Sequence, residues 1–79
     1  MTKLDDVQKN VETGKTKLIE GFVQSALNEG NEPGKILDAM VKAMSIVGDK
    51  FSAGTIFVPE MLIAAKAMAK GVDVLKPHL

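Results

Sequence analysis

Few side chains in this 79-residue chain have the types and spacing of a nucleophilic or metal-binding site. There is one histidine, His78, and there are no cysteines. A serine nucleophile needs a base held beside it, and no histidine forms a recognisable constellation with any of the serines, which are Ser25, Ser45 and Ser52. Clustered His or Cys ligands for a metal are also missing. We therefore expect no metal site, and no catalysis from this chain alone.

Two carboxylates and the histidine stand next to turn-forming residues. Asp49 lies between Gly48 and Lys50, and we expect it to be solvated. Glu60 follows Pro59 in the first turn of a predicted helix, where a carboxylate interacts favourably with the helix dipole, so a structural role is favoured over a functional one. His78 follows a proline near the end of the chain, and we expect an exposed linker residue rather than a ligand.

Composition predicts one small folded domain and excludes several functions. Hydrophobic residues make up 46% and charged residues 25% of the chain, with a formal net charge of zero. The ten basic residues are all lysines mixed with ten acids, and Tyr and Trp are absent, so neither a basic stripe nor an aromatic platform exists to bind nucleic acid. No signal peptide or membrane-spanning run is evident, and we expect a cytoplasmic location with no membrane partner.

Helical periodicity dominates the chain and predicts four helices in an all-α, antiparallel four-helix bundle. A short first helix around Leu4, Val7 and Val11 ends at Gly14. The second is predicted over residues 16–29, with an inward stripe of Leu18, Ile19, Phe22, Val23, Ala26 and Leu27.

Turn residues set the predicted limits of the other two helices. Gly30 closes the second helix, Asn31 is a suitable N-cap, and the third helix runs over residues 33–51 with Phe51 on its inward side. The fourth begins at Pro59 and ends before Pro77. The stretch GTIFV between them is the one segment with β-branched character, and we expect an extended connection there.

The fourth helix has an unusually wide apolar surface. The helix lies in AGTIFVPEMLIAAKAMAKG, residues 53–71, and in the residues after it. All its charged residues from Lys66 onward fall within about a third of the helix circumference. The middle of the apolar arc holds small residues, Ala64, Ala67 and Gly71, and Met61 and Met68 lie on its flank. Two hypotheses remain open: this surface packs closely against another helix, or it is a contact surface for a flat ligand or partner.

The sequence also resembles a known family over nearly its whole length. It is similar to the N-terminal helical cap domain of cobalamin-binding (corrinoid) methyltransferase proteins. The similarity lies in VGDKFSAGTIFVPEMLIAAKAM, in VLKPHL after it and in ALNEGNEPGKILDAMVKAM before it. Such domains occur in methionine synthase and in methylamine and methanol corrinoid proteins. The most specific block is Val47, Gly48, Phe51, Gly54, Phe57, Pro59 and Glu60.

This resemblance implies a cap over the upper face of cobalamin that shields the cobalt-bound methyl group during methyl transfer. It implies that Phe57 faces the methyl side and that Ala64 and Ala67 line the same surface, with Met61 and Met68 beside them. Residues 1–79 are then a cap fragment that lacks a downstream Rossmann-like cobalamin domain. We expect the cofactor in the full-length parent, weak or no binding by this chain alone, and methyltransferase subunits as partners.

Two further expectations follow from the same residues. Similar caps occur in cobalamin-dependent sensors and transcriptional regulators, so such a module is the alternative function, although the absence of Trp favours the methyl carrier. Surplus apolar surface on the fourth helix also favours a homodimer through that helix.

Overall fold

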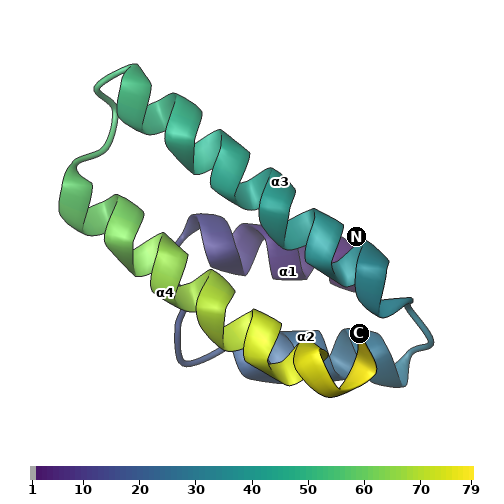
Figure 1. Ribbon diagram of the computed structural model, residues 1–79. Helices are drawn as coiled ribbons and strands as arrows, with labels where there is room; N and C mark the ends of the chain where they lie inside the picture. Colours follow the sequence, from purple (N-terminus) through teal and green to yellow (C-terminus); the bar gives the residue numbers. More distant parts are fainter. Residues whose placement is uncertain (1) are drawn as a thin grey trace.

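The computed structural model describes residues 2–79, which form four α-helices joined by short connections (Figure 1). The helices are α1 (Lys3–Glu12), α2 (Ile19–Asn28), α3 (Pro33–Ser52) and α4 (Val58–Leu75), followed by a single 3-10 turn, η1 (Lys76–His78). No strand occurs within the described residues; residues 54–57 of GTIFV are the expected connection, and Val58 begins α4. The predicted all-α, antiparallel bundle is confirmed.

Local capping explains where α1 begins and ends. The Thr2 hydroxyl accepts a hydrogen bond from the Asp5 backbone N–H (3.2 Å), and the Asp5 carboxylate accepts one from the Thr2 N–H (3.3 Å), which is a reciprocal capping box. Gly14 follows the helix with φ of 68°, a backbone conformation that favours glycine. A Cβ at Gly14 would collide with Ile63, so the connection after α1 packs closely on α4.

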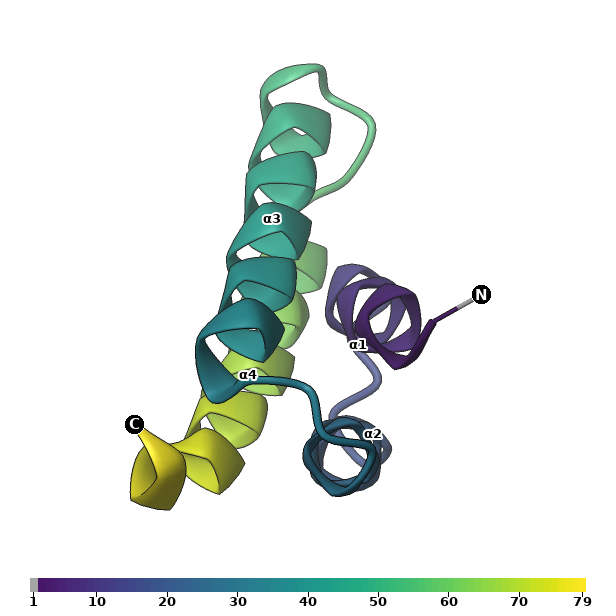
Figure 2. The same cartoon turned by 90° about the vertical axis from the view of Figure 1, so that its right-hand side faces the viewer.

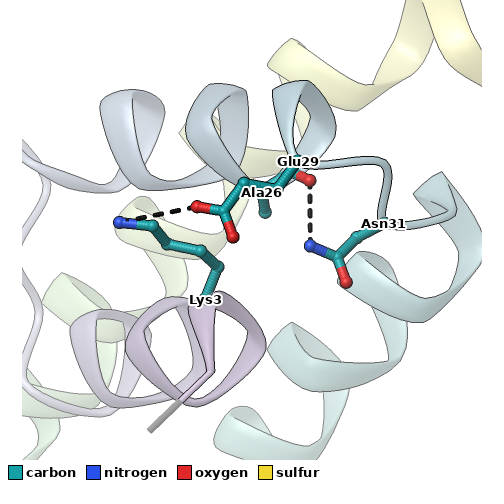
Figure 3. A network of polar contacts seen from close by, with 4 residues as sticks. All are labelled: Lys3, Ala26, Glu29 and Asn31. Carbon is teal, nitrogen blue, oxygen red and sulfur yellow. Dashed lines mark hydrogen bonds and ion pairs between the residues drawn. The ribbon is translucent and has the colours of Figure 1, made fainter.

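The region around α2 differs from the prediction in two ways. The helix begins three residues later than expected, at Ile19, and Leu18 is 53% exposed rather than on the inward stripe. Asn31 is not the N-cap of α3, because Glu32 holds that position without a side-chain hydrogen bond. Instead, the Asn31 Nδ2 donates back to the Ala26 carbonyl oxygen of α2 at 2.9 Å (Figure 3).

The α3/α4 hairpin follows the predicted turn chemistry closely. Pro33 is the first residue of α3, and Gly54 closes its other end with φ of 76° while the Thr55 N–H bonds to the Lys50 carbonyl oxygen at 2.9 Å. Pro59 lies in the first turn of α4, where its missing N–H would have had no helical partner. The Glu60 carboxylate accepts a bond from the Phe57 N–H (3.4 Å) and so secures the start of α4.

The helices form two layers around one core. Figure 2 shows α3 and α4 together on one side and α1 and α2 on the other. The buried side chains that join the layers are Val7, Val11, Ile19, Val23, Ala26, Ile36, Met40, Ala43, Ala67 and Leu75. Because α3 and α4 are roughly twice as long as α1 and α2, the end where they are joined projects beyond the other layer (Figure 1).

Candidate functional site

The small residues of α4 pack against other helices rather than facing solvent. Ala64 and Ala67 are 1% and 0% exposed, and Gly71 is also buried. A Cβ on Gly71 would lie 2.5 Å from the Met40 sulfur and 3.3 Å from Ile19, so glycine lets α4 approach α2 and α3 closely. At these three positions the structure shows close helix packing, and none of the three is exposed in this structure.

The other residues expected at the cofactor surface are more accessible. The Phe57 side chain is 73% exposed and lies just before α4. Met61 is half-buried, and Met68 is half-buried against the core. The five residues expected at one surface, Phe57, Met61, Ala64, Ala67 and Met68, are therefore not brought together on one exposed face.

A different group of apolar side chains is exposed where α3 joins α4. We call it the tip patch, and it consists of Phe51 (38% exposed), Phe57 (73%), Val58 (48%) and Leu62 (55%). The antiparallel hairpin brings the last turn of α3 beside the first turns of α4, and the four-residue spacing of Val58 and Leu62 places them on one side of α4. Phe51 was expected to point inward, and its exposure corrects that prediction.

The tip has a polar side as well. A cleft of about 340 Å³ lies between the end of α1 and the hairpin and is lined by Glu12, Thr13, Val47, Lys50, Ile56, Glu60 and Ile63. Positions 60 and 62 are about 200° apart on a helix, so Glu60 in this cleft and Leu62 in the tip patch point to nearly opposite sides of α4. Three charged residues, Glu12, Lys50 and Glu60, therefore line the cleft beside α1, and Leu62 lies on another side of α4.

Comparison with known proteins assigns the chain to a family. Residues 4–76 match the family model described as "B12 binding domain". The chain belongs to the B12-binding domain family. The resemblance stated from the sequence is thereby confirmed, because the match extends over all four helices.

The similar proteins include corrinoid proteins of methanogens. Monomethylamine corrinoid protein 2 of Methanosarcina acetivorans is 36% identical over 83 residues, a match that covers 100% of this chain and 38% of the relative. Trimethylamine corrinoid protein 2 of the same organism is 39% identical over 69 residues, covering 81% and 32%. The B12-binding domain thus spans about a third of the length of these curated relatives.

A solved structure agrees with these sequence matches. The monomethylamine corrinoid protein of Methanosarcina barkeri superposes with a TM-score of 0.91 at 29% identity, over 95% of this chain and 36% of that one. The helical arrangement of the B12-binding domain is therefore that of one segment of a larger corrinoid protein.

The side chains that could bind a metal ion do not cluster in the part of the B12-binding domain that the structure describes. Within residues 2–79, no three His, Cys, Asp or Glu side chains come together in a way that could hold a metal ion. His78 is exposed in η1. Nor does any helix in this range have the length and apolar character needed to cross a membrane.

Proposed function

We propose that the tip patch covers the upper face of the corrin ring in a corrinoid methyl-carrier protein and shields the methyl group on cobalt. The observation that carries this proposal is the position of the largest exposed apolar side chains. Of the eight large hydrophobic side chains that are exposed within residues 2–79, four form the tip patch. The end of the hairpin that carries them projects beyond the layer of α1 and α2 (Figure 1). Exposed apolar side chains that gather at one place commonly mark a contact surface for a ligand or partner.

The residues of the tip patch fit a flat, largely apolar macrocycle. None of the four carries a charge, and the most exposed is an aromatic ring, Phe57. Binding sites for small molecules are mostly apolar with a few polar groups, which here belong to other parts of the protein. When bound, cobalamin supplies the cobalt that carries the methyl group. The part played by Phe51, Phe57, Val58 and Leu62 is to exclude water and oxidants from that face.

The rest of the binding site would come from outside the residues described. A patch at the end of one hairpin contacts one face of a ring, so the opposite face and the remaining edges need other residues. We propose that they belong to a Rossmann-like cobalamin domain within the two thirds of the relatives that this chain does not match. The names of those relatives support a role beside methyltransferase subunits that act on methylamines or related donors.

A chimeric protein tests the proposal. The matching third of Methanosarcina acetivorans monomethylamine corrinoid protein 2 is replaced by this chain, and the bound, reduced corrinoid is followed by its absorption spectrum in air. We expect Leu62→Lys to speed oxidation several-fold, because a charged chain disrupts the apolar contact with the ring. The matched control is Leu18→Lys on α2, since Leu18 is equally exposed but outside the tip patch. Equal oxidation rates for the two variants would contradict the proposal.

A further inference from the structure

The start of α4 places an aromatic residue where a capping side chain is expected. Phe57 is the N-cap of α4, with φ of −105° and ψ of 167°. Its side chain has no atom that accepts a hydrogen bond, whereas Ser, Thr, Asp and Asn are the residues that cap a helix best. The ring is also 73% exposed, so it adds little to the core. Phe57 therefore breaks a local rule without a gain in packing, which is typical of functional positions.

The Glu60 side chain supplies a capping bond at this helix end. Its Oε1 accepts a hydrogen bond from the Phe57 N–H at 3.4 Å, and the Glu60 backbone N–H donates to the Phe57 carbonyl oxygen at 3.0 Å. The same carbonyl oxygen accepts a bond from the Met61 N–H at 3.2 Å. Bonds at both its N–H and its carbonyl oxygen hold the backbone of Phe57, and the backbone conformation limits the directions that the ring can take.

The start of α1 offers a direct comparison. Its N-cap, Thr2, has φ of −96° and ψ of 165°, and the Asp5 carboxylate accepts a bond from the Thr2 N–H at 3.3 Å. There the Thr2 hydroxyl also accepts a bond from the Asp5 N–H at 3.2 Å, which completes a capping box. At α4 a ring takes the place of that hydroxyl. The side-chain bond from Glu60 therefore matters more for the conformation of Phe57 than the bond from Asp5 does for Thr2.

We propose that Glu60 is a positioning residue, which holds the Phe57 ring in place for its contact with the corrin ring. This inference rests on the proposed function of the tip patch. An aromatic side chain shields a neighbouring group only while it keeps one direction, so the hydrogen bonds that support it matter as much as the ring. Glu60 itself lines the cleft beside α1 and lies outside the tip patch. Its effect on the ligand therefore passes through Phe57.

Hydrogen exchange of the Phe57 amide, followed by NMR in the chain itself, tests the hydrogen bond without any corrinoid. We expect Glu60→Ala to speed exchange several-fold, because the N–H loses its acceptor. Glu60→Gln should exchange like the wild type, since glutamine also serves at this position of a capping box. Glutamine lacks the charge, so this variant separates the hydrogen bond from the charge. Equal exchange in the wild type and Glu60→Ala would overturn the proposal.

The chimeric corrinoid protein described above tests the consequence for the ligand. Glu60→Ala should speed oxidation of the reduced corrinoid several-fold, and Glu60→Gln should keep the wild-type rate. The matched control is Asp5→Ala, which removes the equivalent bond at the start of α1, about two turns from the Glu12 end that lines the cleft. It should leave the rate unchanged. Adding Glu60→Ala to Phe57→Ala should cause no further increase, because the effect passes through the ring.

The outcomes distinguish this inference from the proposed function. If Phe57→Ala and Leu62→Lys both leave the oxidation rate unchanged, the proposed function fails, and the role of Glu60 fails with it. If Leu62→Lys speeds oxidation but Phe57→Ala or Glu60→Ala does not, only the positioning role is overturned. Equal acceleration by Asp5→Ala or by Glu60→Gln, or a further increase in the double variant, would also overturn it. Far-UV circular dichroism verifies that each variant folds.

Discussion

At the scale of single residues, exposure separates apolar side chains that hold the bundle together from those free to make another contact. Ile36 is fully buried, whereas Phe57, a larger side chain, is 73% exposed just outside a helix. Phe51 lies between these extremes at 38%. The large aromatic residues near the hairpin tip therefore contribute less to the core than their size would indicate.

We predict that Phe57→Ala lowers the free energy of unfolding by less than about 1 kcal/mol, because little of the ring is buried. Ile36→Ala should cost about 2–5 kcal/mol through the cavity it leaves, and Phe51→Ala should fall between the two. Urea unfolding of the three variants measures these differences. A loss for Phe57→Ala as large as that for Ile36→Ala would mean that the ring is part of the core, and it would remove the basis of the tip patch.

At the scale of the helices, a few polar contacts hold the short layer in place. Lys3 of α1 reaches Glu29 after α2 (3.8 Å), and its ammonium lies 5.9 Å from the centre of the Phe22 ring. In the same region Asn31 ties the connection to the end of α2 (Figure 3). The exposed ion pair contributes little, so the partly buried Asn31 bond is the one that we expect to matter.

We predict that Asn31→Ala and Asn31→Asp destabilise the protein similarly, by about 1 kcal/mol. Both replacements lose the N–H donor that bonds to the Ala26 carbonyl oxygen. An N-cap would behave differently, because Asp serves as well as Asn at that position. Thermal unfolding at neutral pH distinguishes the two roles. If Asn31→Asp were as stable as the wild type, Asn31 would act as an N-cap instead.

At the scale of the whole molecule, the proposed contact with the corrin ring is an open patch at one end of the protein rather than an enclosing site. We predict that the isolated chain binds cobalamin weakly or not at all, with a Kd above about 1 µM, because the contact must also offset the lost freedom of the ligand. A titration followed by the cobalamin absorption spectrum measures this. A submicromolar Kd would show a binding site elsewhere in the chain.

Much of the architecture was predictable because it depends on local chemistry. Gly30 follows the end of α2, and Pro33 and Pro59 lie in the first turns of α3 and α4, as their backbone preferences indicate. The beginning of α2 was less predictable, because its first turn lacks a capping side chain. The role of Asn31 was missed for a related reason: its side chain reaches backward to α2, and the same residue type also serves as an N-cap.

The sequence by itself determined the four helices, the family and the presence of surplus apolar surface on α4. Only the tertiary structure decided which side of that helix faces the core. Most of its circumference is apolar, so the periodicity of the sequence could not show which pair faces the core, Ala64 and Ala67 or Ala65 and Ala69. Packing settles the rotation, because Gly71 lets Met40 and Ile19 approach α4 at close range, where a Cβ would collide with Met40. Turning Gly71 inward buries Ala64 and Ala67 and leaves Val58 and Leu62 in solvent.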